Sequence, residues 1–479
     1  MADTEEIRPL WQVLLRDQFH DVLPGTCIPS VHEKTRQEVS EVIDKAGEQF
    51  ERIEASAAGG QNPDKIYITN TLSFERQDVF YLEAKDGYHI AGDYPQQMVT
   101  DVYGKKKLAI MNCVIPAFST IELTWIPGEP DGESVFNVSD RVIETPYEKI
   151  TLNEKRYIDS YLDLEENREL RGEGYALNTF LFGEEVSAGW DNWDVDSDFE
   201  TRLSDCAELL SSEVVSDGPV ELRIRNHYKL TEKSDIVQDM IFYANTNEVR
   251  FETLMNWQEE HRFLKTVFDT TIFTDVARQE VQFGYIKRPT TRNDSFEKAK
   301  FEVSNHKYTS LSETRYGAAV LNDCKYGISV ENSKMHLSLH KGGNRPDFKG
   351  DKGTHYCEYA FLPHRGAFGA KTVILPAFRL NVKPVVTNAG RAEQTLAAVD
   401  SDHILIDTVK PSEDKERAFV LRLYEAEGTA ANTKLSISVP VEKAELTNML
   451  EETEQILMGT QEISLQFRPF EIKTLKIFY

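Results

Sequence analysis

The spacing of hydrophobic residues changes once along this chain, near Lys65, and this change restricts the fold more than any other feature. Before Lys65, apolar residues recur every three or four positions, which is the period of an amphipathic helix. After it, apolar and polar residues alternate in short runs such as "VELRIRNHYKL" (220–230) and "KLSISVPVE" (434–442). Alternation is typical of strands with one buried face. The pattern therefore predicts a mainly β protein with helices at its N-terminus.

The N-terminal segment contains two predicted helices. The first runs from Ile7 to Leu23, and the second opens at Ser30 with Glu33 three residues later, which is a capping-box pattern. Together they predict a helical hairpin with "HDVLPG" (20–25) at its turn. Two helices with wide apolar stripes cannot bury both stripes against each other. The hairpin therefore needs a partner surface, either the β region behind it or a domain that precedes this sequence.

Charge and cysteine content argue against several classes of function. The chain has 54 Lys and Arg against 80 Asp and Glu, a net charge of −26, so most of its surface repels nucleic acid and anionic lipid. Its five cysteines include no Cys-x-x-Cys pair, which favours free thiols in a reducing compartment. The start "MADTEEIRPL" lacks the features of a signal peptide, and no apolar run is long enough to span a membrane. We therefore predict a cytoplasmic protein without nucleic-acid or membrane partners.

The turn "QFHDVLPG" (18–25) contains an adjacent histidine and aspartate, His20 and Asp21. The helix dipole favours histidine near a helix C-terminus, and aspartate is common in turns, so the pair alone indicates a site only weakly. A catalytic zinc has three or more protein ligands, and neighbours on one helix point about 100° apart. A metal held by His20 would therefore need ligands from elsewhere.

The segment "GWDNWDVDSDFE" (189–200) contains Trp190 and Trp193 among four aspartates. Apolar ring faces beside carboxylates are typical of a sugar-binding platform, whereas the alternating aspartates suggest a calcium loop. The calcium interpretation fails because Phe199 stands where such a loop requires glycine. A solvated acidic loop with two packed tryptophans remains the purely structural alternative.

A second candidate loop is "LNDCKYG" (321–327), a predicted tight turn that carries Lys325 and Tyr326. Such a loop either reaches into a cleft or only connects two strands. The sequence has no phosphate-binding loop, dinucleotide fingerprint or Gly-x-Ser-x-Gly motif. Nucleotide-binding and serine-hydrolase functions therefore gain no support.

Seven segments from about Leu10 to the C-terminus carry a resemblance when they are taken together. They are "LWQVLLRDQFHDVLPGTCIPSVHE", "NTLSFERQDVF", "GWDNWDVD", "FETLMNWQEEHRFLKTVF", "VQFGYIKRPTTRNDSFEKAKFEV", "YGAAVLNDCKYGISV" and "GTHYCEYAFLPH". A single short motif is easily misleading, but seven in the right order are specific. In this order they resemble the C-terminal half of class II α-mannosidases of glycoside hydrolase family 38.

The resemblance implies a retaining, exo-acting, zinc-dependent α-mannosidase that hydrolyses terminal α-mannosides of oligosaccharides. In the family, the histidine of "QFHD" is a zinc ligand and the next aspartate contacts the mannose, which implies these roles for His20 and Asp21. Retention requires two carboxyl groups about 5 Å apart. In the family both belong to an N-terminal catalytic domain, which is not in this sequence. The resemblance therefore implies no catalytic residue in this chain, which alone is expected to be inactive, and a zinc site shared with that domain.

Further substrate contacts are expected from loops of the β region, because such loops approach the active site in the family. Lys325 and Tyr326 are the first choice for such a contact, and Trp190 and Trp193 for a sugar platform. The rival hypothesis is a non-enzymatic carbohydrate-binding or structural β-sandwich protein. The sequence does not determine which α-mannosidic linkage is cleaved or whether the bound metal is zinc or cobalt. It is also compatible with a homo-oligomer or a monomer, and with a fragment or a natural subunit.

Breaks rich in Pro, Gly and acidic residues at 126–134 and 381–394 divide the β region into three units, so that with the hairpin we expect four units in the mainly β chain. They are a helical hairpin that ends a helical middle domain (1–62), a small β-sandwich (63–132), a large β-supersandwich of galactose mutarotase-like fold (133–390) and a C-terminal β domain (391–479).

Overall fold

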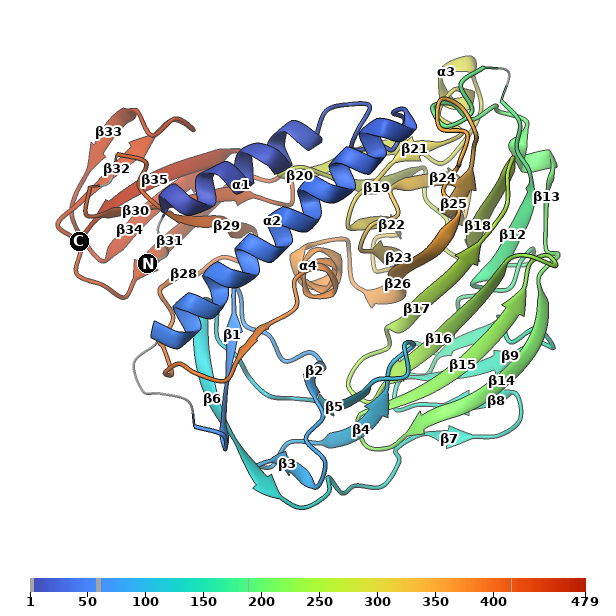
Figure 1. The fold of residues 1–479 in the computed structure, drawn as a ribbon, viewed down its shortest axis with the longest axis horizontal. Helices are drawn as coiled ribbons and strands as arrows, with labels where there is room; N and C mark the ends of the chain where they lie inside the picture. The colour runs from blue at the N-terminus through green and yellow to red at the C-terminus, as the bar shows by residue number, and fades with distance from the viewer. Residues whose placement is uncertain (1–3, 57–61, 188, 415) are drawn as a thin grey trace.

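A helical hairpin followed by antiparallel sheets makes up the chain in the computed structural model, which describes residues 4–56, 62–187, 189–414 and 416–479 (Figure 1). This confirms the predicted fold class. No helix within the described residues is long and apolar enough to cross a membrane. The helices are α1 (Thr4–Asp17), α2 (Pro29–Ser56), α3 (Ser295–Lys298) and α4 (Leu375–Asn381), with a 3₁₀ turn η1 (Phe199–Thr201) and a π turn η2 (Ala370–Ile374).

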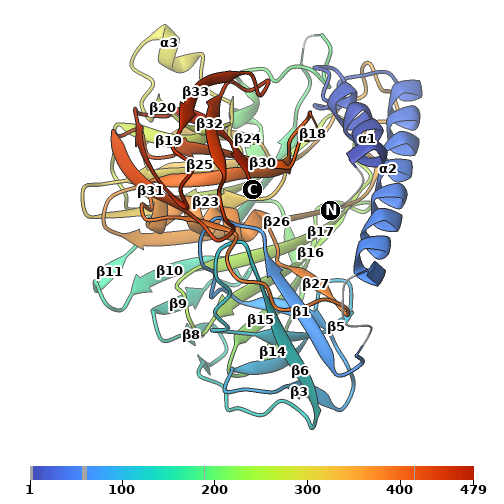
Figure 2. The ribbon, with the colours of Figure 1, turned by 90° about the vertical axis from the view of Figure 1, so that its left-hand side faces the viewer.

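The hairpin forms as predicted, but both helix boundaries at its turn differ from the prediction. α1 ends at Asp17 rather than Leu23, because the amide of Phe19 bonds to the carbonyl of Arg16, three residues back, and the chain continues as a series of turns. α2 begins at Pro29, and proline is favoured in a first helical turn, where its missing N–H is not needed. Figure 2 shows the two helices side by side at one edge of the molecule.

Two small sheets form the first β unit, and they enclose a core of their own. The last strand of the first sheet, β27, follows the large β unit in the chain and returns to pair with β1. The sheet orders are β27-β1-β6-β3 and β2-β5-β4. The strands are β1 (Lys65–Asn70), β2 (Phe80–Glu83), β3 (Tyr88–Ile90), β4 (Gln96–Thr100), β5 (Lys106–Ile110), β6 (Ser119–Pro127) and β27 (Val385–Thr387).

A nine-stranded sheet dominates the large β unit, and it shares one continuous hydrophobic core with a five-stranded and a six-stranded sheet. The nine-stranded sheet, β14-β15-β16-β17-β26-β23-β22-β19-β20, comprises β14 (Glu208–Asp217), β15 (Glu221–Lys229), β16 (Asp235–Tyr243), β17 (Val249–Trp257), β19 (Val276–Val281), β20 (Gly284–Pro289), β22 (Tyr308–Ser312), β23 (Tyr316–Asn322) and β26 (Gly353–Arg365). The six-stranded sheet, β13-β12-β18-β25-β24-β21, comprises β12 (Thr179–Glu184), β13 (Leu203–Ser204), β18 (Arg262–Asp269), β21 (Val303–Ser304), β24 (Gly327–Glu331) and β25 (Lys334–Gly342). The five-stranded sheet, β11-β10-β9-β8-β7, comprises β7 (Asn137–Val138), β8 (Val142–Glu144), β9 (Glu148–Leu152), β10 (Ile158–Asp163) and β11 (Arg168–Glu169).

The C-terminal β unit is a sandwich of two further sheets around a third core. Leu405 and Tyr424 of this unit also pack with α4 and η2, which connects it to the nine-stranded sheet. The strands are β28 (Ala397–Val399), β31 (Ala431–Ile437) and β34 (Glu462–Phe467) in one sheet, and β29 (Ile404–Pro411), β30 (Ala418–Glu425), β32 (Lys443–Thr447), β33 (Thr453–Leu457) and β35 (Ile472–Phe478) in the other.

Candidate functional site at the hairpin turn

His20 and Asp21 lie in the turn between the two long helices, where the sequence predicts the turn of the hairpin, although α1 ends earlier than predicted, at Asp17. The turn is fixed by backbone bonds, including one from the amide of Thr26 to the carbonyl of Asp21 at 3.0 Å. The Thr26 hydroxyl also donates to Asp21 Oδ1 at 3.2 Å. Gly25 adopts φ of 75°, a conformation that favours glycine. The local sequence thus fixes the backbone and holds one oxygen of Asp21.

Both side chains of the pair remain open to solvent. The imidazole of His20 is 67% exposed and the carboxyl group of Asp21 is 42% exposed. His20 Nε2 lies 3.5 Å from Asp21 Oδ2, so the two groups face the same space. The ring of Phe19 packs against the imidazole with centroids 4.4 Å apart.

The tryptophan loop (189–194) is held in place by the buried carboxylate of Asp191. Its two oxygens accept backbone bonds from Arg345 at 2.7 Å and Asn344 at 3.0 Å, and His261 Nδ1 lies 3.0 Å from it. A buried, fully bonded carboxylate fixes the loop, so its neighbours Trp190 and Trp193 project outwards. Their side chains are 64% and 58% exposed.

The hairpin turn and the tryptophan loop meet in space although they are far apart in the chain. The rings of His20 and Trp193 pack edge to face with centroids 6.2 Å apart. Asp21, Trp190 and Trp193 line one mainly apolar hollow of about 590 Å³. The other lining residues are Phe19, Val22, Thr26, Cys27, Ile28, Val31 and Pro346. Four of the six predicted site residues therefore lie together.

The other two predicted residues, Lys325 and Tyr326, do not line this hollow. The Tyr326 ring packs on His306 with centroids 5.0 Å apart, and burial raises the pKa of its phenol. The charge of Lys325 acts on the carboxyl group of Asp351, whose pKa is raised mainly by burial, and Asp351 does not line the hollow either. The turn on which both residues stand connects β23 to β24.

The connection between β25 and β26 also reaches the hairpin, and the sequence did not single it out. Lys349 Nζ donates to Glu33 at 2.7 Å. Ser30 lies inside α2 rather than at its N-cap, so Ser30 and Glu33 do not form the predicted capping box. His32 Nε2 lies 3.8 Å from Asp347 Oδ2. Burial raises the pKa of the Cys27 thiol, and the charges of Asp347 and Asp21 add to this shift. The only signal in the sequence was that "GGNRPDFKGD" (342–351) is rich in Gly, Pro and charge.

The donor set at this turn fits part of a metal site. His20 offers an exposed imidazole and Asp21 an exposed carboxylate, both of which are zinc ligands. Within the described residues, however, no group of three or more His, Cys, Asp or Glu side chains could hold a metal ion. A zinc bound here would therefore take further ligands from outside these residues.

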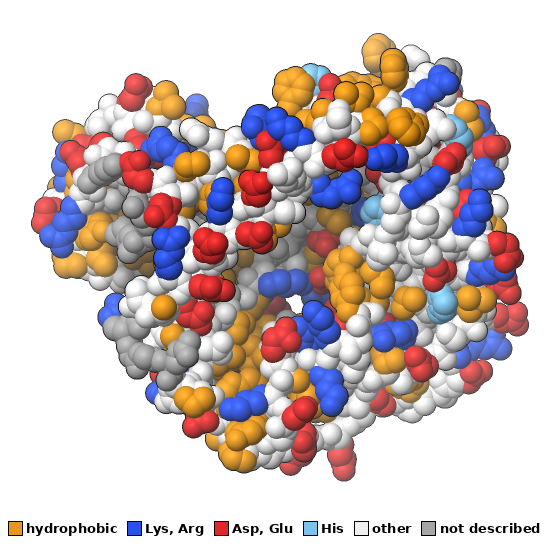
Figure 3. Space-filling model, in the orientation of Figure 1, with side chains coloured by type: hydrophobic (Ala, Val, Ile, Leu, Met, Phe, Trp, Pro, Cys, Tyr) orange, Lys and Arg blue, Asp and Glu red, His pale blue; other side chains and the backbone are white. Residues whose placement is uncertain are grey.

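An apolar surface surrounds the site and continues along the hairpin. Figure 3 shows hydrophobic side chains gathered where the hairpin turn lies. The exposed hydrophobic residues of the hairpin are Trp11, Leu15, Phe19, Leu23, Ile28, Ile43, Phe50 and Ile53, each at least 43% exposed. Exposed hydrophobic side chains gathered in this way are typical of a contact surface. The exposure of these hydrophobic side chains agrees with the prediction that the hairpin needs a further partner surface.

Comparison with protein families finds three matches along the chain. Residues 1–55 match the alpha mannosidase middle domain, residues 143–349 the glycosyl hydrolases family 38 C-terminal domain, and residues 403–475 the family 38 C-terminal beta sandwich domain.

Curated relatives and solved structures agree with these matches. The chain is 30% identical to human Alpha-mannosidase 2C1 over 98% of its own length and 45% of that protein, and 26% identical to an Alpha-mannosidase of Saccharomyces cerevisiae over 99% of the chain and 44% of that protein. It thus spans about half the length of these relatives. The crystal structure of an alpha-mannosidase from Enterococcus faecalis V583 has the same fold, with a TM-score of 0.78 at 14% identity over 99% of the chain and 64% of that protein.

Proposed function

The chain belongs to glycoside hydrolase family 38 as its C-terminal region, and we propose that it is part of a retaining, zinc-dependent exo-α-mannosidase that removes terminal α-mannose from oligosaccharides. Its relatives bear the name alpha-mannosidase, which supports the substrate class. The observation that carries the proposal is the meeting of the turn of His20 and Asp21 with Trp190 and Trp193 around one hollow. In this proposal the cytoplasm is the compartment.

Each of the six predicted site residues has a proposed role. His20 is a zinc ligand, and the bound zinc supplies a Lewis acid that grips vicinal hydroxyl groups of the sugar. Asp21, with one oxygen held by Thr26, accepts a hydrogen bond from a mannose hydroxyl. Trp190 and Trp193 offer apolar ring faces on which a sugar ring stacks. Lys325 and Tyr326 are proposed to contact substrate beyond this hollow.

The remaining machinery is proposed to come from an N-terminal catalytic domain. Retention needs a nucleophilic carboxylate and an acid/base carboxyl group about 5 Å apart. The exposed stripe of the hairpin is the surface on which this domain packs, because covering Trp11, Leu15 and Leu23 removes apolar area from water. The described chain then completes the substrate cleft and does not cleave mannosides alone.

The test is an α-mannosidase assay of the full-length protein that the whole gene encodes, together with analysis of its bound metal. We expect turnover that a chelator abolishes. His20→Ala should lose both turnover and bound zinc. His227→Ala, in a half-buried pair between β15 and Asp235 of β16, should keep both. Turnover unchanged by His20→Ala would refute the ligand assignment. A reading frame without an upstream catalytic domain, together with mannoside binding but no turnover, would favour the rival carbohydrate-binding protein.

A further inference from the structure

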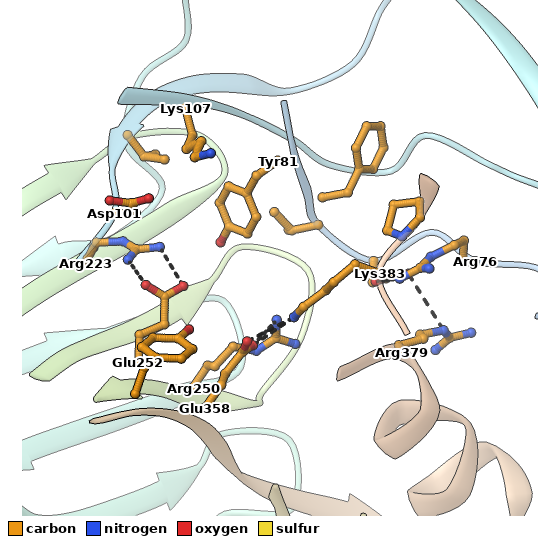
Figure 4. Close-up of a pocket in the computed structure, with 16 residues that line it drawn as sticks. Arg76, Tyr81, Asp101, Lys107, Arg223, Arg250, Glu252, Glu358, Arg379 and Lys383 are labelled. Carbon is orange, nitrogen blue, oxygen red and sulfur yellow. Dashed lines mark hydrogen bonds and ion pairs between the residues drawn. The ribbon is translucent and has the colours of Figure 1, made fainter. Parts of the chain in front are cut away.

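A separate cavity lies at the centre of the molecule, between the small sandwich, the nine-stranded sheet and α4 (Figure 4). It encloses about 330 Å³, and none of its lining residues lines the hollow at the hairpin turn. A second hollow of about 650 Å³ adjoins it and shares Asp78, Val79, Arg250 and Arg379. Figure 3 shows the surface hollowed at the centre of this face, with acidic and basic side chains around the opening. The cavity is therefore reachable from solvent.

Paired acidic and basic groups of the nine-stranded sheet form one wall. Arg223 on β15 is buried and donates from Nη1 to Glu252 on β17 at 2.6 Å. Glu358 on β26 accepts bonds from Lys383 at 3.0 and 3.1 Å and lies 3.1 Å from Arg250. Burial raises the pKa of Glu252, and Arg223 offsets this only in part. This wall presents carboxylate oxygens that accept hydrogen bonds.

The opposite wall contains a guanidinium group with an unused donor. Arg379 Nε is buried and has no hydrogen-bond partner among the described residues, and the nearest carboxylate in contact is Asp78 Oδ1 at 3.9 Å. Arg379 Nη2 donates only to the carbonyl of Glu75, at 3.2 Å. The neighbouring Arg76 is fully engaged, with two bonds to Asp78 and one to the carbonyl of Val382. A buried donor without a partner costs free energy unless a ligand or water satisfies it.

Carboxylates match or outnumber the cations around the cavity, which restricts the kind of ligand. Besides the four lining carboxylates, four more pair with lining cations from outside the lining: Glu83, Glu221, Asp239 and Glu248. A phosphate would therefore gain little net attraction. The six cations are Arg76, Lys107, Arg223, Arg250, Arg379 and Lys383, and the lining carboxylates are Asp78, Asp101, Glu252 and Glu358.

We propose that this cavity binds a neutral polyhydroxylated molecule of the size of one sugar ring, a hexose. Hydroxyl groups both donate and accept, so one ligand can donate to Glu252 and accept from Arg379 Nε. Tyr81, Tyr356 and Phe80 line the same space and offer apolar faces for the C–H side of a pyranose. The volume lies at the lower end for small-molecule pockets, which suits a monosaccharide rather than an oligosaccharide. The inference does not depend on the proposed mannosidase function.

The test is calorimetric titration of the 479-residue chain with D-mannose and D-glucose, and with inorganic phosphate as the anionic probe. We expect saturable hexose binding that weakens at least tenfold in Arg379→Met and in Glu252→Gln, each checked for folding by circular dichroism. Lys371→Met is the matched control, because this exposed lysine on η2 pairs with Asp402 away from the cavity. The hexose binding that depends on Arg379 should persist in Trp193→Ala, the variant that removes the proposed sugar platform at the hairpin turn.

Three outcomes would overturn the proposal. They are no saturable hexose binding, binding of phosphate in place of hexose, or hexose binding that Trp193→Ala removes and Arg379→Met leaves intact. The last would locate the sugar at the hairpin turn. If either cavity variant fails to fold, a crystal of the unaltered chain is soaked in mannose instead. The proposal then requires electron density for the sugar in contact with Arg379. Loss of mannosidase turnover in the full-length protein would leave all these results unaffected.

Discussion

Hydrophobic side chains are exposed on the hairpin of this chain but buried in its β region. Trp11, Leu15 and Phe19 on the hairpin side are 58 to 59% exposed, whereas Phe251 and Trp257 of the large core are completely buried. Burial of apolar area contributes roughly 25 cal/mol per Å², so the hairpin stripe stabilises nothing until something covers it. The difference teaches that the sheets bury their apolar side chains within this chain, whereas the hairpin, which carries the proposed site, leaves apolar side chains free to contact another surface.

The largest expected effect is a difference in unfolding free energy between two matched truncations, one in the buried core and one on the hairpin. Phe251→Ala should lower the free energy of unfolding by about 3–5 kcal/mol, because it leaves a cavity in the shared core. Phe19→Ala should change it by less than about 0.5 kcal/mol, because more than half of this side chain already contacts water. Urea denaturation of the 479-residue chain, followed by tryptophan fluorescence, measures both.

A substantial loss of stability in Phe19→Ala would break the comparison, since it would show that the stripe is covered in the isolated chain. In the full-length protein, Phe19→Ala should lower the free energy of unfolding substantially, because the proposed catalytic domain covers this side chain there. Trp193→Ala serves as a second exposed control at the same site.

Local periodicity predicted the elements of both regions well, but not how distant segments meet. The alternating run "VELRIRNHYKL" predicts a strand, and β15 lies there, because strand formation needs only one buried face. The contact of Trp193 with His20 depends on Asp191 being held by Arg345 and Asn344. Those partners are about 150 residues away, and no local pattern encodes such a bond.

The proposed site was therefore predicted only in part. The family resemblance indicated His20 and Asp21. The sequence did not indicate Arg379 of the separate central cavity, because that cavity forms only where the small sandwich, the nine-stranded sheet and α4 meet. The capping-box prediction was wrong for a local reason, because α2 begins at Pro29 and Ser30 therefore lies inside the helix.

A smaller effect concerns a buried acid in the β region. Burial raises the pKa of Glu148 on β9 to about 8, and both of its oxygens lack a hydrogen-bond partner among the described residues. An unfolded glutamate ionises above its ordinary pKa of 4.5. Between about pH 4.5 and 8 the unfolded chain therefore releases a proton that the folded chain keeps, and stability falls by about 1.4 kcal/mol for each pH unit.

Glu148→Gln should remove this part of the pH dependence. The difference in unfolding free energy between the variant and the unaltered chain should shift in favour of the variant as pH rises from 5 to 7.5, as measured by urea denaturation. Glu41→Gln, on the exposed side of α2, is the hairpin control and should show a constant difference. A constant difference for Glu148→Gln as well would refute the assignment.

The smallest effect is expected where the two regions touch. Lys349, between β25 and β26, pairs with Glu33 on α2 at 2.7 Å, and the two side chains are 58% and 62% exposed. The lysine lowers the pKa of Glu33, but water and salt screen an exposed pair, so it contributes little to stability. Lys349→Met should leave the urea midpoint within error at both low and high salt. A clear loss at low salt that high salt removes would show that this pair, rather than backbone packing, fixes the hairpin to the sheets, and would make the hairpin a hinged rather than a fixed part of the proposed site.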